Sequence, residues 1–344
     1  MKKIKILLLL TTVLAYGVVL KGAYTRLVDA GLGCPDWPGC YGYVLPPLTD
    51  QQTEIANNLY PERPFEEEKA WPEMIHRYLA SLLGFLIMVI AFVCWRKKEE
   101  GYPYRIALLL VPLVIFQGVL GMWTVTMGLF PPIVVAHLLG GFLTASLLTL
   151  MTLRIFKAIP QWPEAPFSNR NKLPKSMQHL ALVALVVVLC QIALGGWTSA
   201  NYAALACLEL PVCHSGWINQ LNFTEAFSIT TVSSGNYEYG ILSENARITI
   251  HVLHRMGAIL TTMVLIGLAW QLLKQDTLLK KQFRILGSML LIGLCIQILL
   301  GIGNIVLHLP LAIAVAHNGV ALSLLVLLLV INLTLRHSMK AYRV

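Results

Sequence analysis

The sequence predicts an all-α polytopic membrane protein, with eight transmembrane helices arranged as two tandem four-helix bundles. Hydrophobic residues make up 57% of the 344 residues and charged residues only 12%, and the mean hydropathy is +0.69. Eight apolar windows are each long enough to cross a hydrocarbon core of about 30 Å as a helix. The second half of the chain also repeats motifs of the first half, which indicates an internal duplication.

The expected helices cover residues 4–25, 74–95, 104–125, 133–154, 178–199, 248–273, 284–306 and 310–335. The first of them begins "MKKIKILLLL" and could also be read as a cleavable signal peptide, because a basic start precedes an apolar core. We favour a retained helix because the internal repeat gives this window a partner in the second half.

Charge patterning predicts the topology. Most of the 26 Lys and Arg residues lie before the first helix, after the last one, or in segments 96–105, 154–175 and 274–284. The positive-inside rule therefore places both termini in the cytoplasm and the long loops 29–72 and 200–246 outside, in a multi-pass protein of the bacterial inner membrane. The net charge of +9 reflects this topology, so we expect no nucleic-acid partner.

Five motif pairs recur in the same order in both halves, separated by 173 to 180 residues: GAYTR and GGWTS, CPDWPGC and CLELPVC, MIHR and VLHR, QGVLG and QILLG, and VAHLLGG and VAHNGVA. An even number of helices per unit makes the units parallel, with pseudo-twofold symmetry about the membrane normal. We expect a first unit at 1–158, a cytoplasmic linker at 159–176 and a second unit at 177–344.

Four histidines occupy matched places in this repeat: His76, His137, His254 and His317. Each lies on the second or fourth helix of its unit, at a similar depth below the outer surface. Two histidines on alternate helices of a bundle can ligate a flat cofactor from both sides. We therefore predict one haem per unit, although a single buried histidine could instead hydrogen-bond a neighbour.

Arg77 and Arg255 directly follow a predicted ligand in each unit. A guanidinium there could pair with haem propionates, or it could simply extend to the interface. Glycines near the histidines would admit a macrocycle or close helix packing: Gly118, Gly121, Gly140, Gly141, Gly301 and Gly303. The sequence "HVLH" at 251–254 resembles one fragment of a di-iron site, and a zinc enzyme would need three converging ligands, so both are weaker alternatives.

The repeat breaks at Glu73, which aligns with His251. Residues three apart share a helix face, so Glu73 would point into the pocket of His76. A carboxylate at a haem edge can accept a proton or stabilise positive charge. It could also cap the helix or pair with Arg77. The asymmetry predicts that the first unit carries the chemistry and that the second carries electrons.

Two cysteine pairs lie in the outside loops. An oxidising compartment favours the disulfides Cys34–Cys40 and Cys207–Cys213, which could be structural or, for the first, redox-active. Four thiolates on one zinc ion are the alternative. Three further cysteines, at 94, 190 and 295, lie inside helices and are interpreted as packing residues.

These motifs together resemble the haem A synthase family: TRLVDAGLGCPDWPGCYG, EMIHR, QGVLGMWTV, AHLLGG, HVLHRMGA, QILLGIGNIVLHLP and AVAHNGVALSLL. The resemblance covers nearly the whole chain. It implies a membrane enzyme that oxidises a methyl group of haem O to the formyl group of haem A, the prosthetic group of terminal oxidases.

The resemblance also implies roles for single residues. His76 and His137 would frame the haem O substrate, with Glu73 as a catalytic carboxylate. His254 and His317 would ligate a haem b that passes electrons. The Cys34–Cys40 pair would be the family's outer-loop disulfide. A haem O synthase and an electron donor are the implied partners, and the oligomeric state, a homo-oligomer included, is left open.

The sequence leaves the mechanism open. Iron held by two histidines has no free position, so either His76 or His137 leaves the iron, or electrons are removed first and water is captured with Glu73 as the base. Two other function classes compete: a di-haem, cytochrome b-like relay and a transporter with a histidine-lined proton path. The carboxylate present in only one unit favours the enzyme.

Overall fold

The computed structural model describes residues 2–156, 174–211, 213, 215–229, 235–275 and 280–340. Within these residues the chain is helical and the only β feature is an isolated bridge between Cys40 and Tyr43. Eight of the described helices are long and apolar enough to cross a membrane, which confirms the predicted fold class. Most of the predicted linker at 159–176 lies outside the described residues.

The membrane-length helices match the predicted windows closely, with ends that differ by a few residues. They are α1 (Lys2–Leu27), α3 (Glu67–Arg96), α4 (Tyr104–Thr126), α5 (Pro131–Ile155), α6 (Lys175–Ala200), α8 (Glu244–Leu273), α9 (Lys280–Val306) and α10 (Leu311–Lys340). Short helices that the sequence did not signal decorate the loops: α2 (Asp50–Leu59), η1 (Lys98–Glu100), η2 (Trp217–Gln220) and α7 (Phe223–Ala226). Because α3 begins at Glu67, Glu73 lies inside the helix rather than at its mouth.

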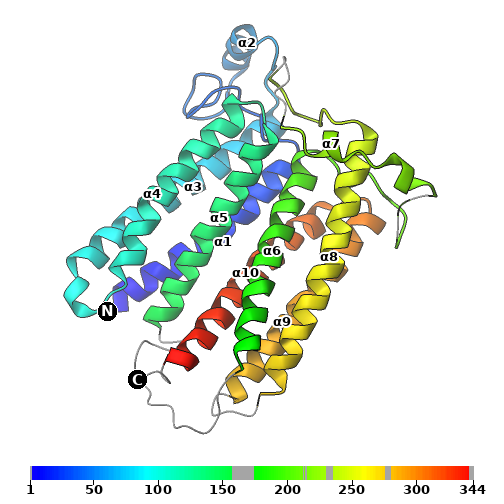
Figure 1. The fold of residues 1–344 in the computed structure, drawn as a ribbon. Helices are drawn as coiled ribbons and strands as arrows, with labels where there is room; N and C mark the ends of the chain where they lie inside the picture. Colours follow the sequence, from blue (N-terminus) through cyan, green and yellow to red (C-terminus); the bar gives the residue numbers. More distant parts are fainter. Residues whose placement is uncertain are drawn as a thin grey trace.

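The helices form one bundle whose long axes run in roughly the same direction (Figure 1). In the first half α1 contacts α3, α3 contacts α4, α4 contacts α5, and α5 returns to α1. In the second half α6, α8, α9 and α10 follow the same order. The halves meet where α1 and α5 pack on α10 and where α5 packs on α6. The neighbour order is thus repeated, while the twofold axis itself stays a prediction.

Several hydroxyl and amide groups in the spans find partners within the protein, as a hydrocarbon solvent favours. Threonine hydroxyls donate to the carbonyl four residues earlier in several spans. Thr12 of α1 and Thr152 of α5 join their hydroxyls at 2.8 Å. In the second half the Asn332 amide donates to the Ala181 carbonyl at 2.9 Å, which ties α10 to α6. Each of these two interhelical bonds ties together two helices of the same half.

The outer loops lie at one end of the bundle, opposite the beginning of α1 and the end of α10 (Figure 1). Residues 235–241, which we call the crossover segment, belong to the second outer loop but contact the first half. The Tyr237 amide donates to the Gly128 carbonyl at 2.8 Å, in the tight turn between α4 and α5. The Lys69 ammonium lies 3.3 Å from the Tyr239 hydroxyl, and Arg63 pairs with Glu238 at 3.8 Å.

A second connection lies beside the crossover segment. Arg26, at the outer end of α1, donates to the Ser199 carbonyl at the end of α6. Its guanidinium also covers the Tyr202 ring at 4.0 Å and pairs with Asp29 at 3.3 Å. The cation–π contact and the hydrogen bond attach the outer ends of the two halves to each other.

The crossover segment packs against Gly128 so closely that a side chain there would not fit. Its φ is +57°, and a Cβ there would overlap the Gly235 carbonyl. We expect Gly128→Ala to detach the segment and to increase its cleavage in limited proteolysis. Gly101→Ala is the matched control, because Gly101 has φ +80° but open space, so it carries only the backbone strain. Equal cleavage of the segment in both variants would show that the contact at Gly128 does not hold it in place.

Candidate functional site

Each of the four predicted ligand histidines lies against a glycine of a neighbouring helix. A Cβ built on any of these glycines would fall 3.0 to 3.4 Å from the imidazole Cε1. The pairs are His76 of α3 with Gly22 of α1, His137 of α5 with Gly121 of α4, His254 of α8 with Gly195 of α6, and His317 of α10 with Gly301 of α9. The four contacts therefore follow one rule, and only Gly121 and Gly301 had been singled out from the sequence.

His76 and His137 face each other across the first half. Their ring centroids are 6.4 Å apart and their planes are nearly perpendicular, at 88°. Two metal–nitrogen bonds of about 2 Å each, extended by the two ring radii, require a similar separation. The Nδ1 atoms of both rings are buried and have no hydrogen-bond partner among the described residues. The first half thus brings its two predicted ligands together in an arrangement that fits axial ligation.

The second pair is held by glutamines that the sequence analysis missed. The Gln191 amide nitrogen lies 3.1 Å from His254 Nδ1 and donates to the His254 carbonyl at 2.9 Å. The Gln297 amide nitrogen lies 3.2 Å from His317 Nε2. The motif pair QGVLG and QILLG contains Gln297, so a signal for it existed. Gln191 had none, because the repeat places an apolar residue, Val18, at the corresponding position.

The donor set favours a porphyrin over a metal ion bound by protein side chains alone. Among the residues that the structure describes, no group of three or more His, Cys, Asp or Glu side chains could hold a metal ion. A haem brings four ring nitrogens of its own and needs only one or two protein ligands. The facing histidines of the first half are compatible with that need, and haem ligation in both halves stays a prediction.

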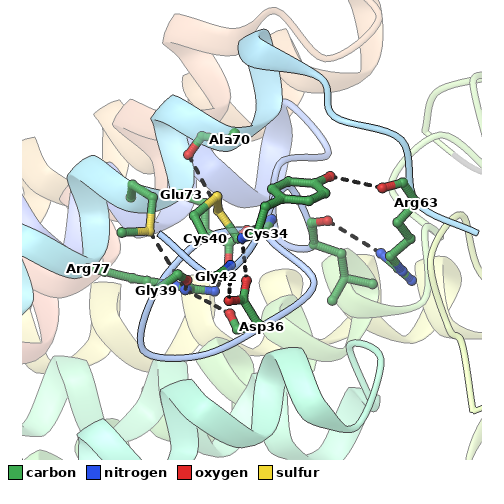
Figure 2. The surroundings of a disulfide bond; sticks show 12 residues. Cys34, Asp36, Gly39, Cys40, Gly42, Arg63, Ala70, Glu73 and Arg77 are labelled. Carbon is green, nitrogen blue, oxygen red and sulfur yellow. Dashed lines mark hydrogen bonds and ion pairs between the residues drawn. A yellow bond between two sulfur atoms is a disulfide. The ribbon is translucent and has the colours of Figure 1, made fainter. Parts of the chain in front are cut away.

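Glu73 lies three residues before His76 on α3 and is buried, with 4% of its surface exposed. One carboxylate oxygen accepts the Cys34 backbone N–H at 2.8 Å, and the other pairs with Arg77. Figure 2 shows this carboxylate next to the disulfide loop at the start of the first outer loop. The pairing with Arg77 is one of the alternatives that the sequence left open. The carboxylate keeps acceptor capacity beyond these two contacts, because its two oxygens together offer about four sites.

The guanidinium of Arg77 also closes the disulfide loop. It donates to the carbonyl oxygens of Asp36 at 3.0 Å and Pro38 at 3.3 Å, and to that of Gly39 (Figure 2). Arg255 does the same in the second half, donating to the Glu209 carbonyl at 2.7 Å and to the Cys207 carbonyl. Both arginines therefore hold their cysteine loops against the bundle, and their predicted contact with haem propionates stays a prediction.

Both predicted disulfides, Cys34–Cys40 and Cys207–Cys213, are formed. These cysteines consequently offer no thiolates for the zinc alternative. In the first loop the Asp36 carboxylate accepts the backbone N–H groups of Tyr41 and Gly42 at 2.6 and 2.8 Å.

The aromatic ring of Tyr41 anchors this loop beyond the ends of the membrane-length helices. It packs edge-on against Tyr60 and Phe65, and burial raises the pKa of its phenol to about 12. The neutral phenol is therefore the form that the folded loop stabilises, up to alkaline pH.

His251, the counterpart of Glu73, is also buried. Its Nδ1 lies 2.8 Å from the Ala203 carbonyl, so it ties α8 to the loop that follows α6. Among the described residues no carboxylate pairs with His251, whereas Glu73 forms an ion pair with Arg77. The two halves therefore share the imidazole pairs, the arginines and the disulfides, and differ at this one position in charge.

Comparisons with known proteins agree with the arrangement. The family model described as COX15-CtaA, cytochrome oxidase assembly protein, matches residues 5–329. A protein named heme A synthase from Shewanella oneidensis is 48% identical over 332 residues, which are 96% of each chain. Proteins of the same name are 27% identical in Shouchella clausii, over 73% of this chain and 70% of that one, and in Chelativorans sp., over 94% and 88%.

Substituting Gly22 tests the contact with His76. A Cβ at Gly22 would lie 3.0 Å from the imidazole, so Gly22→Ala should displace the ring. Overpacking of this kind costs about 1–3 kcal/mol, so first-half haem affinity should fall by roughly 5- to 100-fold. Spectroscopic haem titration measures it. Gly17→Ala in the same helix is the control, since nothing lies within 4 Å of a Cβ there. Equal affinities would show that the glycine does not position His76.

Replacing the two arginines one at a time distinguishes their contributions to the stability of the protein. Arg77→Met leaves Glu73 as a buried, unpaired carboxylate, a change that typically costs about 3–5 kcal/mol. Arg255→Met removes similar carbonyl contacts without stranding an acid, so we expect a clearly smaller drop in thermal stability. Adding Glu73→Gln to Arg77→Met should restore much of the loss. Equal melting temperatures for the two single variants would contradict the importance of the ion pair.

Proposed function

Because this chain belongs to the COX15-CtaA family of cytochrome oxidase assembly proteins, we propose that it is a haem A synthase, which oxidises a methyl group of haem O to a formyl group. The observation that carries the proposal is the first half itself. Two half-buried imidazoles 6.4 Å apart frame a place for a porphyrin, and a buried carboxylate with no counterpart in the second half lies three residues from one of them.

We assign His76 and His137 to the substrate haem. Their helices, α3 and α5, hold the two rings from opposite sides, and glycines of α1 and α4 leave room for each ring. Such fixed placement lets the side chains orient one methyl group of the macrocycle relative to the acid beside it. Positioning is the main contribution that these residues make.

Glu73 is the proposed proton acceptor. Turning a methyl into a formyl group removes two hydrogen atoms and adds one oxygen atom, so protons must leave the site. The carboxylate is anchored by the Cys34 N–H and by Arg77, which keep it in place beside the His76 turn. An anchored base near the reacting carbon can take up a proton or stabilise positive charge that develops there.

His254 and His317 are the proposed ligands of a haem b. When bound, this haem supplies one-electron redox chemistry and can take electrons from the oxidised substrate. The chain contributes the two imidazoles, and the side-chain amides of Gln191 and Gln297 lie 3.1 and 3.2 Å from a ring nitrogen of His254 and His317.

The proposed setting follows from topology and from the substrate. The protein spans the bacterial cell membrane with both termini in the cytoplasm and both disulfide loops outside, where oxidation maintains disulfides. A haem O synthase delivers the substrate, and a separate redox partner exchanges electrons with the protein. The domain division at 159–176 is proposed on the same grounds as the repeat.

Pigment analysis tests the function directly. The protein is produced in cells that make haem O, and the extracted haems are identified by chromatography and mass. We expect haem A or its hydroxylated precursor with the unaltered chain. Glu73→Gln should abolish these products and keep haem b, since the chemistry and the second site are separate. His254→Ala should lose the haem b. Haem b alone, at two per unaltered chain, would contradict the proposal.

A further inference from the structure

The side chain of Gln117 in α4 is a buried polar group that the proposed mechanism does not use. It is 9% exposed, and its amide nitrogen has no hydrogen-bond partner among the described residues. A buried donor without an acceptor is unfavourable, and native structures rarely keep one without reason. Its partner is therefore to be sought in the molecule that the first half binds.

The amide lies beside the first histidine pair, on its inner side. A Cβ at Gly140 would overlap the Gln117 amide nitrogen, and Gly140 follows His137 by one turn of α5. The His137 imidazole also lies beside the Gln117 backbone carbonyl. Since α5 begins at the outer end with Pro131, Gly140 is about 4.5 Å deeper than His137 along the helix axis.

This depth determines which part of a porphyrin meets the amide. The two propionates are charged and favour the outer, watery edge of the site, because burying them in hydrocarbon is costly. The opposite edge of the ring then points inward, towards Gln117. In haem O this edge bears a prenyl side chain with a hydroxyl group, where haem b has a vinyl group. A hydroxyl oxygen accepts hydrogen bonds and a vinyl group does not.

We propose that the Gln117 amide donates a hydrogen bond to the side-chain hydroxyl of the substrate and so helps the first half to select haem O over haem b. The inference rests on the proposed function and names a specificity residue within it. A site that hydrogen-bonds a hydroxyl disfavours the analogue that lacks it, because the donor is then left unpaired.

The second half supplies the contrast. Gln297 occupies the position in QILLG that Gln117 occupies in QGVLG. Its amide nitrogen lies 3.2 Å from His317 Nε2, while its carbonyl oxygen has no partner among the described residues. In the half assigned to haem b, which has no such hydroxyl, the amide nitrogen thus has a ring nitrogen within hydrogen-bond distance, whereas the Gln117 amide nitrogen in the half assigned to haem O has no partner among the described residues.

Haem titration tests the inference. The purified protein with its second-half haem b in place is titrated anaerobically with haem O or haem b, and binding is followed by absorbance. Gln117→Met keeps the size of the side chain and removes the donor. We expect its dissociation constant for haem O to rise about 5- to 10-fold, the effect of one hydrogen bond, with that for haem b within about twofold of the unaltered chain.

Two further variants keep the test decisive. Gly140→Ala should displace the amide and give the same selective loss. Gln178→Met is the control. Gln178 of α6 donates to the Leu335 carbonyl, and both residues are distant in sequence from Gln117 and the first histidine pair, so neither haem affinity should change. Equal weakening of both haems by Gln117→Met, or no change for haem O, would overturn the inference. Failure of the unaltered chain to bind haem O would overturn the proposed function with it.

Discussion

The close approach of an imidazole to a glycine is the constraint on which both halves depend. Each of the four histidines occupies volume that a side chain on the neighbouring helix would otherwise fill, as at Gly22 and Gly195. The absent side chains let α1 approach α3 and α6 approach α8 with the ring held between them. The same contact recurs between α4 and α5 and between α9 and α10, at Gly121 and Gly301.

Much of this arrangement could be predicted from the sequence, because hydropathy and the repeat report it directly. Apolar windows gave the eight spans, and matched motifs gave the histidine pairs and the cysteine pairs. The partners of Arg77 could not be predicted, since a spacing along a helix does not reveal which loop carbonyls fold back onto it. Gln191 was missed for a related reason: it lies in a featureless apolar window, and the repeat puts Val18 in its place.

Two differences between the halves lie near the first histidine pair. A carboxylate replaces an imidazole at Glu73, and the donor of Gln117 is left without the partner that Gln297 has. Both changes introduce polar capacity that a structural role does not require. The same neighbour order of helices in both halves thus accommodates different polar side chains near the histidines.

The crossover segment makes the two halves depend on each other. Tyr237 and Glu238 of the second loop cover the turn and loop of the first half, and Arg26 reaches from the first half to the end of α6. Neither bundle can be detached at the linker without uncovering backbone groups that the other one satisfies. The two halves are therefore one structural unit at this end of the bundle, because each completes hydrogen bonds of the other.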